Sequence, residues 1–128
     1  IANLPSAYNS VRVDEENGVA INMQYSGNSG LLADNTAMSF TPPKSAGFMV
    51  ITNGAGQSAR MAQVSYSTSI GTMADSGYVG SVMNLTTGAL SGTTGTDTKI
   101  NISAVTDGKI YIENRSGSDQ NMYWTLMR

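Results

Sequence analysis

The chemistry open to this chain is limited first by the side chains that it lacks. Its 128 residues include no histidine and no cysteine. A Ser-His-Asp triad, a thiolate nucleophile and a disulfide framework are therefore excluded. A zinc site would have to use carboxylates alone, which is an unusual ligand set. Nine Asp and Glu residues remain as candidates for acid–base catalysis or calcium binding.

The acidic residues are not arranged as catalysis requires. Glycoside hydrolysis needs two carboxyl groups, one of them with a pKa raised by burial. None of the nine lies where alternation along a strand would bury it. The run Asp14-Glu15-Glu16 could supply part of a calcium site, but successive carboxylates lack the spacing of a calcium-binding loop, so a solvated turn is favoured. We therefore expect no enzyme, no metal site and no cofactor.

Polar loops are better candidates for ligand binding. The segment 53–60 (NGAGQSAR) lacks the GxxxxGK[ST] pattern and the third glycine of GxGxxG, so it predicts a hairpin loop rather than a phosphate loop. The segment 69–77 (SIGTMADSG) is expected to be an exposed loop, and the tyrosine that follows it could stack on a sugar ring. The predicted ligand-binding residues are Asn53, Gln57, Arg60, Asp75 and Tyr78.

The composition indicates short strands joined by many turns. Ser, Thr, Asn and Gly account for 54 residues, whereas Leu, Ile, Val and Phe account for only 24. Such a small apolar content suggests disorder only when the net charge is high, and here the net charge is −2. Turn signals recur about every 8 to 15 residues, as in sandwiches and barrels. The sequence predicts one all-β domain over 1–128, an antiparallel jelly-roll-like sandwich of about seven to nine short strands with little or no helix.

Charge and hydropathy limit the partners. Seven Lys and Arg residues leave no basic patch, so we expect no nucleic-acid binding. No apolar run approaches the roughly 18 residues of a membrane span, so we expect no membrane insertion. Residues 1–10 are expected to form an extended lead-in from an upstream fibre or shaft.

Two hairpins can be placed from their turn dipeptides. Asn17-Gly18 separates two strand-like runs near the start of the chain, and Asp107-Gly108 separates 99–105 from 109–115. For the second hairpin we expect a three-residue loop with a glycine bulge, pairing Ala104 with Ile112, because that register keeps the apolar residues on one face. The continuous apolar run 48–51 predicts the most central strand.

The last strand-like run, 122–127, has large apolar groups on both faces. Burial on both sides is therefore expected, either in the middle of a sheet or between subunits. We predict that Met122, Trp124 and Leu126 lie at a subunit interface. The small apolar content supports this prediction, because neighbouring copies could complete the core.

Two stretches resemble a known family. The segments 30–53 (GLLADNTAMSFTPPKSAGFMVITN) and 104–117 (AVTDGKIYIENRSG) are similar to the C-terminal tip domains of tailed-bacteriophage tail fibres and tailspikes. The matching segments are structural, so the resemblance transfers no binding residue. It implies a β-sandwich knob, usually trimeric, that ends a fibre of the virion and touches the host surface.

Three functions follow as expectations. The first is a non-enzymatic fibre or spike tip domain that adheres to a host bacterial receptor, a surface glycan or an outer-membrane receptor, as a homotrimer on the virion surface. The second is a purely structural module for trimerisation or capsid decoration. The third, and least favoured, is a glycan-cleaving tailspike enzyme.

Overall fold

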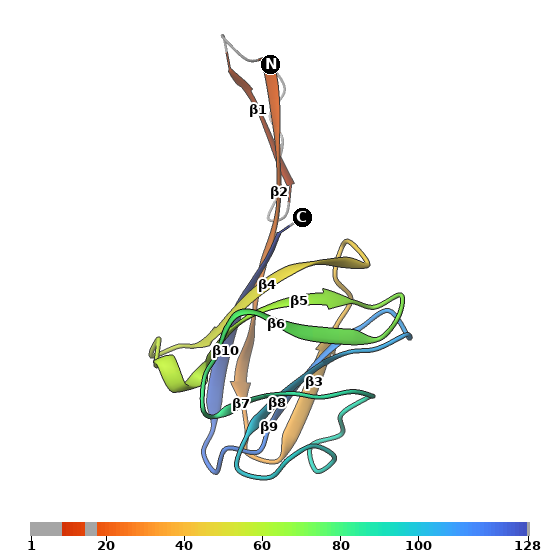
Figure 1. Ribbon diagram of the computed structural model, residues 1–128. Helices are drawn as coiled ribbons and strands as arrows, with labels where there is room; N and C mark the ends of the chain where they lie inside the picture. Colours follow the sequence, from red (N-terminus) through yellow and green to blue (C-terminus); the bar gives the residue numbers. More distant parts are fainter. Residues whose placement is uncertain (1–8, 15–17, 128) are drawn as a thin grey trace.

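Two packed β-sheets form the body of the molecule (Figure 1). The computed structural model describes residues 9–14 and 18–127, with side chains from Tyr25 onward. The larger sheet has the order β1-β2-β10-β4-β5-β6, and the smaller has the order β3-β9-β8-β7. The elements are β1 (Asn9–Asp14), β2 (Gly18–Leu32), β3 (Thr36–Phe40), β4 (Ala46–Asn53), the 3₁₀ turn η1 (Ser58–Arg60), β5 (Met61–Ser67), β6 (Thr72–Val79), β7 (Met83–Leu85), β8 (Ile100–Ala104), β9 (Ile110–Asn114) and β10 (Gln120–Met127).

The predicted all-β sandwich with little helix is confirmed. Ten strands are described, where about seven to nine were expected. The core between the sheets takes alternate residues from the strands of the larger sheet and meets the apolar face of β8 and β9. The described residues include no helix long and apolar enough to cross a membrane.

β10 lies between β2 and β4 in the middle of the larger sheet, as the apolar run at 122–127 predicts. Trp124 stacks on Phe40 of the opposite sheet, with ring centroids 4.4 Å apart and planes at 4°. Met122, Trp124 and Leu126 are buried in the core of a single chain. A subunit contact through β10 would therefore have to use its other face.

The prediction that β10 is covered on both faces is wrong for the single chain. Tyr123 and Met127, which alternate with the core residues, are 43% and 41% exposed. The neighbouring strand β4 is also central, as predicted, yet Phe48 on its outer side is 55% exposed. The sandwich covers only the inner side of the larger sheet, which leaves these large apolar side chains in solvent.

β8 and β9 form the predicted hairpin in a different register. The loop is three residues long, 106–108, and Gly108 has a φ of 89°, the left-handed conformation of a glycine bulge. Ala104 pairs with Ile110 and not with Ile112, so the predicted pairing is wrong by two residues. Because a shift of two positions keeps every side chain on its own face, the apolar face is the predicted one.

The segment 69–77 differs from the sequence prediction. Most of it belongs to the exposed edge strand β6 and is not a loop. β6 ends at Val79, and the chain then turns towards β7 in the other sheet. An edge strand with only two partly buried residues shows no apolar alternation, which is why the pattern did not reveal it.

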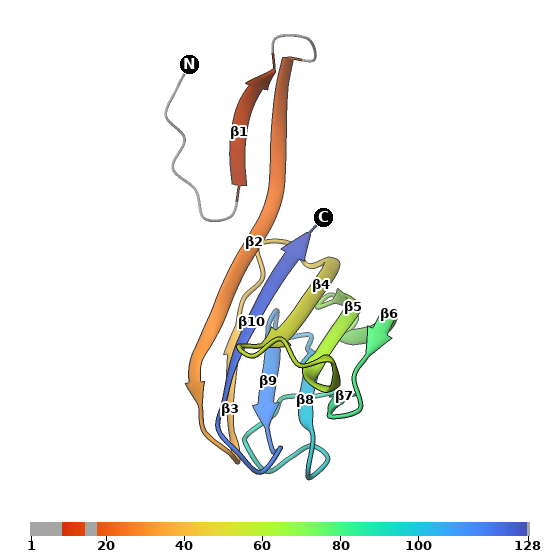
Figure 2. The same cartoon turned by 90° about the vertical axis from the view of Figure 1, so that its left-hand side faces the viewer.

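β1 and the first half of β2 form the hairpin predicted at Asn17-Gly18. In both Figure 1 and Figure 2 this hairpin extends beyond the end of the sandwich. Residues 1–8 of the predicted lead-in and the turn residues 15–17, with most of the acidic run, lie outside the described residues.

The position of Trp124 gives a stability test. We expect Trp124→Ala to lower the free energy of unfolding by about 3–5 kcal/mol, because the change leaves a cavity against Phe40. Met127→Ala, on the outer side of the same strand, should cost less than about 1 kcal/mol. Urea unfolding of both variants measures the difference. Equal losses in the two variants would contradict the buried contact of Trp124 with Phe40.

Candidate functional site

The outer side of the larger sheet carries the strongest candidate for a binding surface. Its strands β10, β4 and β5 point alternate side chains outward, and β6 closes one edge. Two adjoining hollows lie on this side. They share Val50 and Gln63, and all of their lining residues are uncharged.

The larger hollow, called here the β6 groove, has a volume of about 290 Å³. It is lined by Val50, Ser58, Met61, Ala62, Gln63 and Tyr78. Tyr78 is 42% exposed and pairs across the strands with Gln63. The groove therefore combines an exposed ring and aliphatic surface with hydroxyl and amide groups, and its volume is near the lower limit of typical small-molecule sites.

Strand β6 has a β-bulge beside this surface. Between the pairs Gln63–Tyr78 and Val64–Asp75 the register shifts, so Ser76 and Gly77 have no direct partner on β5. The backbone N–H of Gly77 donates to Asp75 Oδ1 at 2.9 Å and holds the bulge. A Cβ at Gly77 would contact Oε1 of Gln63, so β6 passes close to this flexible amide side chain. Bulges of this kind often re-aim a side chain beside a functional site.

The smaller hollow, of about 250 Å³, continues the surface from Gln63 towards β10. Phe48, Val50, Ser76 and Met127 contribute to its lining. Phe48 and Met127 are direct cross-strand neighbours. Its lining, like that of the β6 groove, combines apolar with uncharged polar side chains.

The predicted loop residues Asn53, Gln57 and Arg60 lie together, but they mainly hold their own loop. Asn53 is buried, and its amide donates to Gln57 Oε1 at 2.7 Å and to Gln120 Oε1 at 3.2 Å. The backbone N–H of Gln57 donates back to Asn53 Oδ1 at 3.0 Å. Arg60 Nη1 donates to the same Gln57 Oε1 at 3.2 Å. This network positions Ser58, which lines the groove.

The five predicted residues thus have different places. Tyr78 lines the β6 groove, Asp75 holds the bulge beside it, and the other three hold the adjacent hairpin loop. The sequence did not point to Gln63 or Met61. Only the pairing register of β4, β5 and β6 brings these two residues to the groove, and a short sequence motif does not contain that information.

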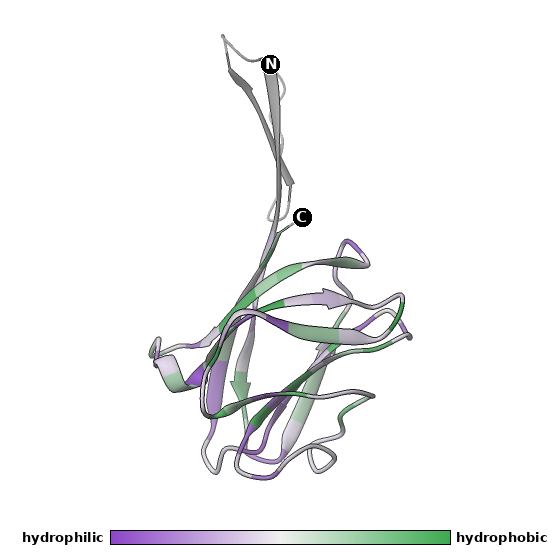
Figure 3. Ribbon diagram, viewed as in Figure 1, coloured by the Kyte–Doolittle hydropathy of each residue, from purple (hydrophilic) through white to green (hydrophobic). Residues whose placement is uncertain are grey.

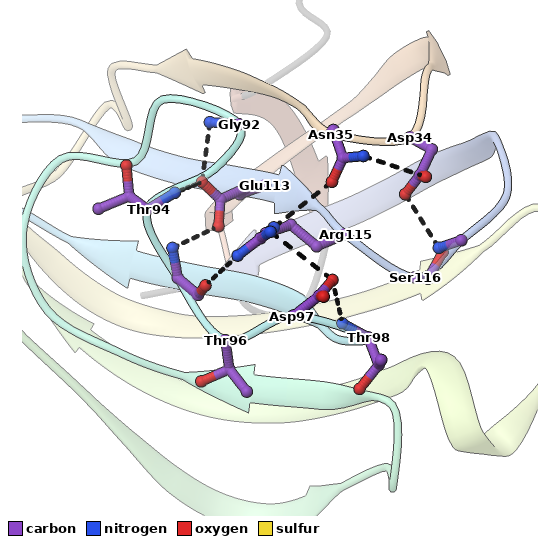
Figure 4. A network of polar contacts seen from close by, with 12 residues as sticks. Asp34, Asn35, Gly92, Thr94, Thr96, Asp97, Thr98, Glu113, Arg115 and Ser116 are labelled. Atoms are coloured by element: carbon purple, nitrogen blue, oxygen red, sulfur yellow. Dashed lines mark hydrogen bonds and ion pairs between the residues drawn. The ribbon is translucent and has the colours of Figure 1, made fainter.

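Figure 3 shows hydrophilic residues in the β9–β10 turn and at the start of β10. At the same end of the fold a buried carboxylate organises the loop between β7 and β8 (Figure 4). Glu113 Oε2 accepts from the backbone N–H groups of Gly92 and Thr94 at 2.8 and 3.0 Å. Glu113 Oε1 accepts from the N–H of Gly95 at 2.8 Å and from Asn101 Nδ2 at 3.0 Å.

Full burial of Glu113 contradicts the expectation that alternation leaves every acid exposed. Burial by itself raises the pKa of this carboxyl, but the hydrogen bonds from Thr94, Gly92, Gly95 and Asn101 outweigh it and hold the pKa below its ordinary value. A carboxylate that is ionised and fully occupied by donors is not available as a general acid or base. Its role is to close the loop over the outer side of β8, where Asn101 and Ser103 are buried together with Glu113.

Arg115 extends this network to neighbouring turns. Its Nη1 donates to the carbonyl of Gly95 at 2.7 Å, and its Nη2 lies 3.7 Å from Asp97 Oδ1. Its Nε reaches Asn35 Oδ1 in the β2–β3 turn at 3.4 Å. Because Asp97 is 73% exposed, the ion pair contributes little to stability. The contacts of Arg115 mainly join the β9–β10 turn to the β7–β8 loop and to the β2–β3 turn.

Among the described residues, no three acidic side chains gather as a metal site would require. Comparison with protein-family models, curated proteins and solved structures finds no match to this chain.

The carboxylate at Glu113 gives a pH-dependent prediction. We expect Glu113→Gln to lower the free energy of unfolding by about 1–3 kcal/mol at neutral pH, because an amide NH₂ would face N–H donors. Since folding lowers the pKa of this carboxyl, the stabilisation is complete above about pH 4.3, the pKa of an unfolded glutamate, and is lost as the pH falls towards the folded pKa.

Urea unfolding from neutral to acid pH measures this difference. Asp97→Asn, at an exposed carboxylate of the same network, is the matched control and should cost less than about 0.5 kcal/mol. A difference between wild type and Glu113→Gln that widens on acidification would contradict the assignment.

Proposed function

We propose that this chain is a non-enzymatic attachment module of a tailed-phage fibre or spike, which binds a neutral glycan of the bacterial surface in the β6 groove. The observation that carries the proposal is the uncharged lining of the groove, with the half-exposed ring of Tyr78 beside Gln63 and Ser58. The two stretches that resemble fibre and tailspike tip domains support the virion context.

The lining of the groove matches the surface of a sugar ring. A pyranose presents a C–H face that packs on aromatic or aliphatic side chains, and hydroxyl groups at its edge that need hydrogen-bond partners. Tyr78, Met61 and Val50 supply apolar surface, while Gln63 and Ser58 supply a donor and acceptors. No lining residue offers a charge, so a neutral sugar suits the groove better than a sialic or uronic acid.

The same lining argues against turnover of the glycan. General acid–base cleavage requires two carboxyl groups across the scissile bond. The groove is lined by none, and Glu113 is buried with its oxygens occupied by donors elsewhere in the fold. Binding without cleavage is the activity that this surface supports.

A purely structural role in trimerisation or capsid decoration is the second candidate. The observation in its favour is the exposed pair Phe48 and Met127 on adjacent strands, since apolar surface of this kind often marks a protein interface. This pair lines the smaller hollow and lies outside the β6 groove. The two roles are compatible on one sheet.

A glycan array of neutral and acidic bacterial polysaccharides tests the proposal. We expect binding to neutral glycans only, and we expect Tyr78→Ala to weaken the best one roughly two- to twelvefold in calorimetric titration, the usual contribution of one stacked ring.

Tyr123→Ala is the matched control, because Tyr123 is similarly exposed on the same sheet but does not line the groove. It should leave affinity unchanged. Absence of binding to every glycan at millimolar concentration would favour the structural role. Loss of polysaccharide viscosity on incubation with the protein would show an enzyme.

A further inference from the structure

The two hollows on the outer side of the larger sheet meet at a pair of residues. Val50 on β4 and Gln63 on β5 line both hollows, and they are direct partners across the two strands. The β6 groove continues from this pair to Tyr78, and the smaller hollow continues from it to Phe48 and Met127. The hollows are therefore two parts of one surface that extends over β6, β5, β4 and β10.

Each hollow has an exposed aromatic ring of its own, Tyr78 in the β6 groove and Phe48 in the smaller hollow. Tyr78 is paired with Gln63, which is paired with Val50, and Phe48 lies two residues before Val50 on β4. At the usual strand dimensions the two rings are offset by roughly 10 Å across the sheet and roughly 7 Å along it. One sugar ring cannot stack on both side chains, whereas two sugar rings joined in a chain can.

Hydrogen-bonding groups accompany both rings. Ser58 lines the β6 groove with Tyr78, and Ser76 lines the smaller hollow with Phe48. Gln63 is exposed and belongs to both hollows. Because its amide has both an acceptor oxygen and an NH₂ donor, it can bond to two neighbouring sugar units at once.

The bulge in β6 brings one edge strand to both hollows. Ser76, which belongs to the bulge and has no direct partner on β5, lines the smaller hollow. Tyr78, which follows the bulge, lines the β6 groove. Asp75 Oδ1 holds this arrangement by accepting from the N–H of Gly77 at 2.9 Å. Bulges often re-aim side chains beside functional sites, and this one serves both hollows.

A contact with another protein is the competing explanation for the exposed pair Phe48 and Met127. Two observations favour a sugar instead. The smaller hollow is continuous with the β6 groove, and all lining residues of both hollows are uncharged mixtures of apolar and polar side chains. The β6 groove alone is near the lower limit of small-molecule sites, and the adjoining 250 Å³ brings the whole surface into their usual range.

We propose that the smaller hollow is a second subsite, so that the domain holds two successive sugar units of one neutral polysaccharide chain, with Gln63 bonded to both. The inference rests on the proposed function, because it takes the first unit to stack on Tyr78. Once that unit is bound, contact of the next unit with Phe48 is intramolecular and strengthens the binding of the chain. The domain thereby selects a polysaccharide over the free sugars of which it is made.

A series of fragment lengths tests the second subsite. The probe is the neutral polysaccharide with the strongest signal on the glycan array, cut into fragments of one to six sugar units. Each fragment is titrated into the full chain, and backbone amide resonances report even weak binding. We expect the association constant to rise roughly two- to twelvefold when the fragment becomes long enough to reach Phe48, the usual contribution of one stacked ring. An association constant that is the same for one unit as for six would overturn the proposal.

Two variants separate the subsites. Phe48→Ala should lose most of the gain from longer fragments, whereas Tyr78→Ala should weaken the binding of fragments of every length. Tyr123→Ala is the matched control, since Tyr123 is exposed on the same sheet and lines neither hollow, and it should keep the wild-type dependence on length. A gain that merely reflects the larger number of equivalent units would persist in Phe48→Ala, and that result would overturn the second subsite. Fluorescence of Trp124, the one tryptophan, shows whether the sandwich of each variant is intact.

The remaining outcomes separate failure of this inference from failure of the proposed function. Binding that depends on Tyr78 but not on fragment length would leave the β6 groove as a site for a single sugar and overturn only the second subsite. Absence of binding by every fragment would overturn both. A lower sedimentation mass for Phe48→Ala than for the wild type would assign Phe48 to a contact between protein molecules, and the second subsite would again be overturned.

Discussion

The stacking of Trp124 on Phe40 is the contact on which the rest of the structure depends. It joins the middle strand of the larger sheet to the edge strand β3 of the smaller one. Once Trp124 faces inward, strict alternation sends Tyr123 and Met127 outward, and the cross-strand pairs impose the same alternation on β4 and β5. Which side chains form the outer surface is therefore a direct consequence of how the core is packed.

The outer sides of the two sheets differ in whether their polar side chains are buried. On the smaller sheet, the outer side of β8 and β9 is covered by a loop that closes around Glu113, so a charge is buried with four donors and contributes to order. On the larger sheet, no loop within the described part of the chain covers the outer side, and uncharged side chains remain in solvent. A surface left open in this way, with a tyrosine beside an amide and a hydroxyl, suits an uncharged ligand such as a neutral sugar.

Local pattern was enough to predict the features that depend on neighbouring residues. Alternation at 99–105 and 109–115 with Asp107-Gly108 between them predicts the hairpin and its buried face, and the run 48–51 predicts a central strand. Features that depend on distant residues could not be obtained this way. Burial of Glu113 requires a loop from another part of the chain, the β6 groove requires the register across three strands, and an exposed edge strand such as β6 has no apolar period to detect.

Titration of the isotope-labelled protein with the best neutral glycan, followed through backbone amide resonances, tests whether the glycan binds in the β6 groove without being cleaved. Concentration-dependent shifts are expected at Gln63, Gly77 and Tyr78 and none at Gly92 or Gly95 around Glu113, and the glycan should be unchanged at the end of the titration. Shifts confined to the loop around Glu113 would show that the glycan does not bind in the β6 groove.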